Sequence, residues 1–259
     1  MRSLIIFGHR GVGSVSLAAH LAAAYAEAGR SVALIDCAGA QATTLISRTP
    51  PADGEVWSGG YKGIACRQWQ TDPAGSGRPA ALAGLREEIE ARSPAVELVL
   101  FALADAFDVL DQLLAAELAS QIVAVTDAEP VALRTVNALW RRMAGRGIEV
   151  GLVGHNLSAF YAEAVVRDFA RQTGTLLQGY LPRDLAVLRS SFFGETVIES
   201  APLAHVAYLY RELARLFVEP GTALPPTAMA EDDFNHWAAL WGERLYDLGE
   251  GYVPPGGGI

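Results

Sequence analysis

A glycine-rich segment near the amino end has residue types and spacing that could do chemistry. Residues 8–16 read GHRGVGSVS, after the apolar run Leu4–Phe7 and before apolar residues at near-helical spacing over 14–28. Glycines between a strand and a helix allow backbone N–H groups to wrap the oxygens of a phosphate. The segment therefore predicts the phosphate-binding loop of a nucleotide-binding fold.

The side chains that grip and hydrolyse a nucleotide are missing from this loop. The phosphate-loop pattern G-x-x-x-x-G-K-[ST] uses lysine to neutralise the outer phosphates and a hydroxyl to hold Mg²⁺. The corresponding positions here are Ser14 and Val15, and a valine cannot coordinate a hard cation. Arg10 or His9 could supply charge instead, although the favoured interpretation is that both are ordinary surface residues of a loop. The vestigial site is predicted to comprise Gly8, His9, Arg10, Gly11, Val12, Gly13, Ser14, Val15 and Ser16.

Strand-like and helix-like segments alternate from residue 3 to residue 217. This alternation predicts an α/β, three-layer phosphate-loop fold, with a mostly parallel sheet covered by helices on both faces. Ligands of such sheets bind at the carboxyl ends of the strands. Those ends are expected at Gly8–Ser14, Asp36–Ala42, Ala102–Asp108, Asp127–Glu129 and Leu181–Asp184. Among the strands behind them, we expect Val96–Ala102 and Val150–Val153.

Composition narrows the class of protein. The 259 residues are 51% hydrophobic and carry a net charge of −9, which argues against non-specific nucleic-acid binding. With no membrane-length apolar run and no signal peptide, we expect a cytoplasmic protein that does not bind membranes. Cys37 and Cys66 are the only cysteines and form no metal-binding pattern, so we expect structural thiols and no metal site.

The end of the chain forms a separate region. We assign 1–219 to the phosphate-loop domain, and 220–259 to a linker, an amphipathic helix at 232–248 and a disordered tail. Phe234, Trp237 and Trp241 lie on the apolar side of this helix. They predict either packing on the chain's own core or an exposed face that contacts a subunit or partner protein.

Several stretches resemble the nitrogenase iron-protein family, which includes the iron proteins of chlorophyll-type reductases, within the MinD/ParA class of phosphate-loop ATPases. The most specific is the strand ending in PRD, followed by TVI, a proline and YRELA, over residues 174–216. Residues 60–66, GYKGIAC, resemble the segment that leads to the family's first cluster loop, and DAEPVAL at 127–133 is nearer the wider class. The resemblance covers about residues 3–217.

The resemblance implies a homodimer that binds ATP between its subunits and shares one [4Fe–4S] cluster, each subunit giving two cysteines. The family's catalytic lysine falls on Ser14, its Mg²⁺ hydroxyl on Val15 and its second lysine on His9. In the first switch, the acidic positions fall on Cys37 and Gln41, and the aspartate of the second switch falls on Ala102. Asp105 or Asp108 could replace the second-switch aspartate only if the loop follows a different path from the family's.

The cluster cysteines are missing as well. The first would lie within 75–78 and the second within ALADAFDV at 102–109, and neither stretch holds a cysteine. Because thiolates hold such clusters, we expect no Fe–S cluster. The family's residues near the adenine are retained more fully than its phosphate and cluster ligands. Pro182, Arg183 and Asp184 match the family, and the family's asparagine falls on His155 or Asn156. ATP or ADP binding therefore remains possible.

These losses predict a pseudo-ATPase that acts as a partner-binding, regulatory or assembly subunit, with a reductase-like component or an iron-protein paralogue as its partner. One alternative is a working ATP-dependent electron-transfer subunit with atypical ligands. A second is a positioning protein of the MinD/ParA kind, although the acidic helix at 232–248 is a poor lipid binder.

Overall fold

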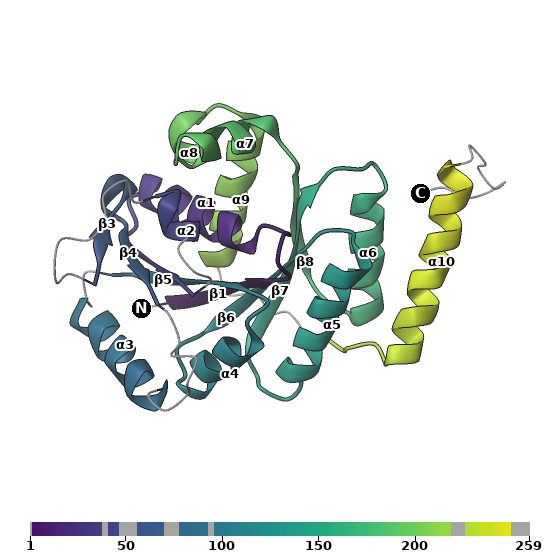
Figure 1. Ribbon diagram of the computed structural model, residues 1–259, viewed down its shortest axis with the longest axis horizontal. Helices are drawn as coiled ribbons and strands as arrows, with labels where there is room; N and C mark the ends of the chain where they lie inside the picture. The colour runs from purple at the N-terminus through teal and green to yellow at the C-terminus, as the bar shows by residue number, and fades with distance from the viewer. Residues whose placement is uncertain are drawn as a thin grey trace.

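The computed structural model describes residues 2–37, 41–46, 56–69, 78–92, 96–218 and 226–249. An eight-stranded sheet forms the centre of the molecule, in the order β3-β4-β2-β5-β1-β6-β7-β8 (Figure 1). The strands are β1 (Arg2–Gly8), β2 (Val32–Asp36), β3 (Ser58–Gly59), β4 (Ala65–Gln68), β5 (Leu98–Ala104), β6 (Gln121–Thr126), β7 (Glu149–Leu157) and β8 (Leu177–Pro182). Every pairing is parallel except that of the short edge strand β3 with β4.

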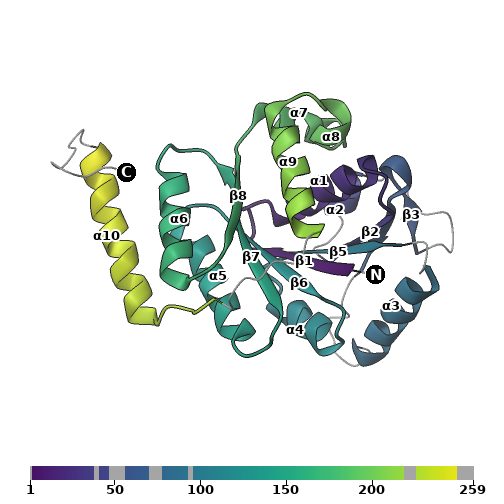
Figure 2. The same cartoon turned by 180° about the vertical axis from the view of Figure 1, so that it is seen from behind.

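Helices cover both faces of the sheet, as Figure 2 shows from behind. One face carries α1 (Ser14–Glu27), α2 (Gln41–Thr44), α8 (Val197–Ser200) and α9 (His205–Val218), with α7 (Leu185–Phe192) at their end. The other carries α3 (Arg78–Arg92), α4 (Phe107–Ala115), α5 (Pro130–Met143) and α6 (Ala162–Thr173), with α10 (Glu231–Gly249) outside α6. A 3-10 turn, η1 (Tyr61–Gly63), precedes β4. The predicted three-layer α/β fold is confirmed.

The central strands are buried on both faces because their sequences are apolar throughout. Leu4, Ile5, Ile6 and Phe7 of β1 have no exposed surface, and neighbouring strands show the same continuous burial. Such runs are typical of parallel sheets sandwiched between helices. β7 continues past the predicted end at Val153 because 153–157 keep pairing with β8. β5 likewise starts and ends two residues later than predicted, so that Ala102 lies inside it.

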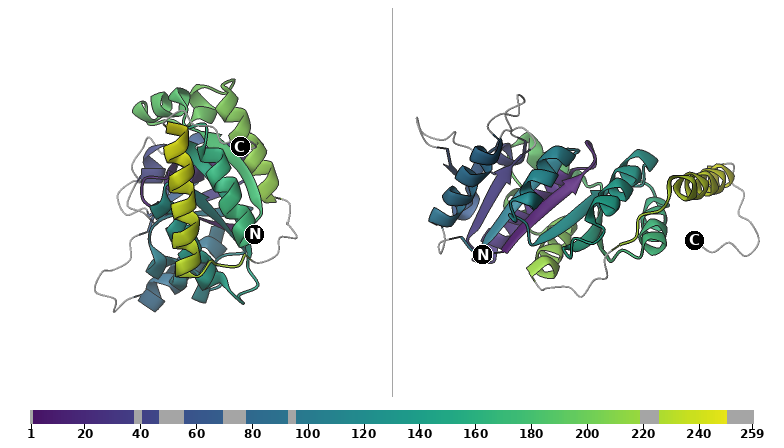
Figure 3. Two further views of the ribbon diagram at one scale, coloured as in Figure 1. Left: turned by 90° about the vertical axis from the view of Figure 1, so that its right-hand side faces the viewer. Right: turned by 90° about the horizontal axis from the view of Figure 1, so that it is seen from below.

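The C-terminal helix α10 packs on its own domain. Phe234 is fully buried and Trp237 is 7% exposed, and both rings contact the ring of Phe169 on α6. The alternative of an exposed tryptophan face is therefore wrong for these two residues, because α6 offers them an apolar surface. Trp241 is half-buried, and its indole Nε1 donates to Asp168 Oδ2 at 2.9 Å. Figure 3 shows α10 lying along the outside of the domain, beside α6.

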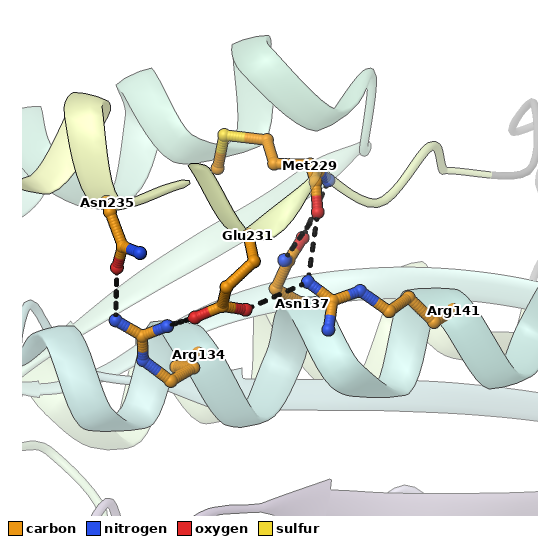
Figure 4. A network of polar contacts seen from close by, with 6 residues as sticks. All are labelled: Arg134, Asn137, Arg141, Met229, Glu231 and Asn235. Atoms are coloured by element: carbon orange, nitrogen blue, oxygen red, sulfur yellow. Dashed lines mark hydrogen bonds and ion pairs between the residues drawn. The ribbon is translucent and has the colours of Figure 1, made fainter. Parts of the chain in front are cut away.

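Polar contacts fasten the start of α10 to α5 (Figure 4). The Asn137 side chain donates to the Met229 carbonyl at 3.0 Å and accepts from the Met229 N–H at 2.8 Å. Glu231 pairs with both Arg134 and Arg141. These contacts fix the helix at its first turn. The predicted linker, except Pro226, and the predicted disordered end lie outside the described residues.

Candidate functional site: the glycine-rich loop

The loop between β1 and α1 has the backbone of a phosphate-binding loop. Gly11 and Gly13 have φ values of 96° and 88°, a region that side chains disfavour. A Cβ on Gly8 would lie 2.7 Å from the Val125 carbonyl oxygen, so this position needs glycine to fit against β6. Gly13 is the N-cap of α1 and provides no side-chain cap, so the helix begins with unsatisfied N–H groups. The glycine spacing thus produces the loop shape that it predicts.

The side chains of Ser14 and Val15, which follow the loop, are buried against the sheet and the core. Ser14, at the lysine position, is 2% exposed, and its Oγ donates to the Leu103 carbonyl of β5 at 2.9 Å. Val15, at the position of the Mg²⁺ ligand, lies in the first turn of α1, is 8% exposed and packs into the core. The serine hydroxyl is engaged by the sheet and the valine has no oxygen. Neither residue fits Mg²⁺ or can neutralise a γ-phosphate.

The loop opens on a cavity of about 510 Å³. It is lined by Arg10, Gly11, Gly13, Ser14, Val15, Ser16, Cys37, Leu45, Ala104 and Ala106. Arg10 is the charged residue among these lining positions, while His9 is half-buried and lies outside the lining set. Six of the nine residues predicted around the loop therefore come together at one cavity.

Buried rings support the loop from behind. The His155 ring lies against Gly13, where a Cβ would come within 2.5 Å of Cε1. Its Nδ1 lies 2.7 Å from the Val12 carbonyl oxygen, which can only accept, so Nδ1 carries the proton. Nε2 then accepts from the Tyr210 hydroxyl at 3.1 Å. This chain of bonds ties the loop to α9.

His20 completes the cluster. Its ring stacks on Tyr210 with centroids 4.4 Å apart, and its Nδ1 donates to the Ser16 carbonyl at 2.8 Å. Burial lowers the pKa of both His20 and His155 to about 4, because a charged imidazole would lose its hydration. Both histidines are therefore neutral near pH 7. Sequence patterns alone did not predict this cluster, although a histidine within the apolar helix that follows the loop was a usable signal.

Carboxylates do not line the described loop cavity. Asp36 at the end of β2 is 1% exposed, and its Oδ2 accepts from the Ala42 N–H at 2.9 Å. Asp105 and Asp108 are exposed and lie outside the lining set. Ala102, where the second switch would begin, lies within β5 and is fully buried. Neither candidate replacement for the second-switch aspartate reaches the cavity.

Of the residues predicted near an adenine, His155 lies against the loop, while Asn156, Pro182, Arg183 and Asp184 are not among the residues that line the loop cavity. Asp184 is the N-cap of α7, where its Oδ1 accepts from the Ala186 N–H at 2.6 Å. Asn156 and Arg183 line a different cavity, beneath α10. Pro182 ends β8 with its side chain exposed. Asn156 and Arg183 thus share a cavity whose described lining is separate from that of the loop cavity.

Neither thiol lies where the family resemblance places the cluster cysteines. Cys66 lies in β4 with 1% of its surface exposed, and burial raises the pKa of its thiol to about 12. Burial also raises the pKa of Cys37, with the charge of Asp36 adding to the effect. Clusters are held by thiolates, and these positions favour the protonated form. Among the described residues, no group of three or more histidine, cysteine or acidic side chains could hold a metal ion.

The strand order, the helices on both faces of the sheet and the glycine-rich loop together form the α/β fold of phosphate-loop proteins. The structure is similar to a ParA family ATPase from Chlorobium tepidum, with a TM-score of 0.66 and 14% identity over 83% of this chain and 97% of that one. It is also similar to MinD from Aquifex aeolicus in its MinC:MinD complex, with a TM-score of 0.65 and 17% identity over 86% and 98%. At these identities the likeness shows the fold.

Sequence comparison shows the family. Residues 52–240 match the 4Fe-4S iron sulfur cluster binding proteins of the NifH/frxC family, so the chain belongs to that family. It is 25% identical to nitrogenase iron protein 2 of Methanobacterium ivanovii over 263 aligned positions, which cover 91% of this chain and 97% of the relative. The resemblance inferred from the PRD and YRELA stretches is confirmed. Within the described part of the chain, no helix has the length and hydropathy needed to cross a bilayer.

Proposed function

We propose that this chain is a NifH/frxC family protein that neither hydrolyses ATP nor carries a cluster, and that it works by binding a protein partner. Its partner would be a component of a nitrogenase-like reductase system, and its role regulatory or one of assembly. The observation that carries this proposal is the Ser14 hydroxyl, which occupies the lysine position and donates to Leu103. Without lysine and a metal ligand, the transferred phosphoryl group loses its main charge stabilisation.

Absent cluster ligands support the same proposal. The sequence has two cysteines, and neither lies in the stretches where the family resemblance places the cluster ligands, within 75–78 and 102–109. The proposal therefore leaves the family's redox role out of this chain.

Exposed apolar side chains on α7 support a protein partner. Leu185 and Phe192 are each 81% exposed and lie seven residues apart, on one side of the helix, with Leu188 between them. Phe193 follows at 64% exposure. Large apolar side chains grouped in this way mark contact surfaces more often than isolated ones do. We therefore assign the partner contact to α7, and not to the predicted residues Phe234 and Trp237, which are buried against their own domain.

The enzymatic half of the proposal is tested on anaerobically purified protein. Iron content and ATP hydrolysis are measured on one sample, beside Ser14→Ala and Arg10→Gln variants. We expect no stoichiometric iron and no hydrolysis above background in any of the three proteins. Hydrolysis that disappears in either variant would refute the proposal, as would about four iron atoms per dimer.

Calorimetric titration with ATP and ADP, with and without Mg²⁺, then asks whether the loop cavity keeps a ligand. Binding that does not depend on Mg²⁺ is the expected form, because Val15 cannot hold the metal. A Mg²⁺-dependent affinity would contradict the assignment of Val15.

The partner half is tested by co-expression with the catalytic component of a nitrogenase-like reductase and light scattering of the purified complex. We expect a complex that Phe192→Ser weakens and Phe160→Ser does not, since Phe160 is 74% exposed but lies before α6. The same measurement on the chain alone tests the expected homodimer. Equal weakening by the two variants would exclude α7 as the contact.

A further inference from the structure

A cavity of about 540 Å³ lies between the last turn of α1 and the second half of α9, two helices on the same face of the sheet (Figure 2). We call it the α1–α9 cavity. It shares no described lining residue with the glycine-rich loop cavity, where α1 begins. The 14 residues of α1, about 20 Å of helix, separate the two. The α1–α9 cavity therefore lies away from the carboxyl ends of the strands, where the family resemblance places the nucleotide.

Arginines dominate the polar lining of the α1–α9 cavity. Arg30, Arg211 and Arg215 line it, and Glu27 is the carboxylate among its described lining residues. The Arg211 guanidinium donates to both oxygens of Glu27, from Nε to Oε2 at 2.6 Å and from Nη2 to Oε1 at 3.0 Å. These bonds hold the pKa of Glu27 below its usual range. Because this pair is neutral, Arg30 and Arg215 leave the described lining with a net positive charge.

The carboxylate partners of Arg30 and Arg215 compete only weakly with a ligand. Arg30 Nη1 lies 3.6 Å from Glu97 Oε2, and both side chains are about half exposed. Arg215 Nη1 lies 2.6 Å from Glu212 Oε1, and both side chains are largely exposed. Neither glutamate is among the described residues that line the cavity. Exposed ion pairs contribute little, because water screens them and ordering two long side chains costs entropy. An anion in the cavity can therefore take the place of either carboxylate.

A buried hydroxyl without a partner belongs to the same cavity. Tyr25 lines it and is 2% exposed, and its hydroxyl makes no hydrogen bond within the described part of the chain. Such groups are rare in folded proteins, because an unpaired buried donor loses its bonds to water without replacement. Burial raises the pKa of Tyr25, against the opposing charges of Arg2 and Arg30. The hydroxyl is thus a protonated donor close to Arg30, and it suits an anionic acceptor.

We propose that the α1–α9 cavity binds a phosphate monoester, which carries nearly two negative charges near pH 7. Its oxygens accept from the guanidinium groups of Arg30 and Arg215 and from the Tyr25 hydroxyl. Phosphate fits better than a carboxylate, because it offers three outer oxygens to several donors and two of them match one planar guanidinium group. The apolar part of the lining, which suits a short aliphatic body, consists of Ala24, Ala28 and Ala214. This site goes beyond the proposed function, and neither requires the other.

The test is calorimetric titration of the full chain with three probes of similar size: propyl phosphate, butyrate and butylammonium. We expect propyl phosphate to bind most tightly, butyrate more weakly and butylammonium not at all. Arg215→Gln should weaken propyl phosphate about ten- to a hundredfold, the range for a hydrogen bond to a charged group. The matched control is Arg189→Gln, because Arg189 is exposed on α7, is not among the lining residues and should leave the affinity unchanged when replaced.

Tyr25→Phe separates binding from folding. The hydroxyl has no partner in the free protein, so its removal breaks no hydrogen bond and should not lower the free energy of unfolding in urea. The same variant should weaken propyl phosphate about tenfold or more, because the bound phosphate loses a donor. Arg10→Gln should leave the affinity unchanged, since Arg10 lines the glycine-rich loop cavity.

Several results would overturn the assignment. One is the absence of propyl phosphate binding at millimolar concentration to a protein whose circular dichroism shows it folded. Another is butyrate or butylammonium binding as tightly as propyl phosphate, which would remove phosphate as the ligand. Equal weakening by the Arg215 and Arg189 variants would indicate a general charge effect. Weakening by Arg10→Gln but not by Arg215→Gln would move the phosphate to the glycine-rich loop. None of these results bears on the iron and hydrolysis assays that test the proposed function.

Discussion

Replacing Tyr210 by phenylalanine removes the hydroxyl that donates to His155 and should loosen the glycine-rich loop. His155 Nδ1 is committed to the Val12 carbonyl, so Nε2 must accept and has lost its donor. Tyr210 is 1% exposed and His155 is 6% exposed, so water cannot easily replace the lost partner. An unpaired buried acceptor costs about 1–3 kcal/mol, and we expect the free energy of unfolding to fall by that amount. This is a sizeable part of the roughly 5–15 kcal/mol that stabilises a typical domain.

Urea unfolding measures the stability change, and amide hydrogen exchange at residues 11–14 measures the loop. Tyr208→Phe is the control, because Tyr208 lies on the same helix and is 49% exposed. The double variant His155→Leu/Tyr210→Phe should lose less than the sum of the single variants. The Val12 carbonyl loses its donor in both His155 variants, but without the imidazole the Tyr210→Phe change no longer leaves Nε2 unpaired. If Tyr210→Phe matches Tyr208→Phe in both stability and loop exchange, the hydrogen bond does not hold the loop.

Three further predictions concern the loop and α10. Gly13→Ala should lower the free energy of unfolding in urea more than Gly11→Ala does. Both positions have a positive φ, but only at Gly13 would a Cβ come within 2.5 Å of the His155 ring, and equal losses would mean that the ring moves aside. His20 and His155 have folded pKa values of about 4, below the 6.5 of the unfolded chain. The free energy of unfolding should therefore fall by about 3 kcal/mol for each histidine as the pH drops from 6.5 to 4, and it should not depend on them above pH 6.5. A free energy of unfolding that stays constant between pH 6.5 and pH 4 would contradict the assigned burial. Asp168→Asn should shift the tryptophan fluorescence to the red and lower the free energy of unfolding by about 1–3 kcal/mol, measured by heat or urea, because two indole donors lose a shared carboxylate. The control is Asp233→Asn at an exposed position, and identical spectra for the two variants would show that Asp168 does not hold the rings.

The fold could be predicted because its determinants are local. Continuous apolar runs such as Leu4–Phe7 specify buried parallel strands, and helical spacing of apolar residues specifies the helices between them. The loss of the lysine and the metal hydroxyl was equally visible, since Ser14 and Val15 are defined by their distance from Gly8 and Gly13. Spacing along the chain is enough for a motif that one short segment carries.

Whether the C-terminal helix packs on its own domain or on a partner could not be predicted from spacing along the chain. Phe234 and Trp237 have the same apolar pattern whether they face a partner or their own domain. The choice depends on Phe169, more than sixty residues away, which offers them a surface. An amphipathic pattern specifies that one side will be buried, but not against what.

The sequence alone determined the α/β class, the strand–loop–helix opening, the family and the missing catalytic groups, because each depends on residue types at fixed spacing within a segment. Only the tertiary structure decided that His155 supports the loop from behind while its neighbour Asn156 lines another cavity with Arg183. The physical reason is that the pairing of β7 with β8 is irregular between His155 and Leu157, and Asn156 there has a φ of 59°, so the two neighbours do not follow one regular strand and can serve different sites. Which site each one serves depends on the elements packed there, α9 on one face and α10 on the other.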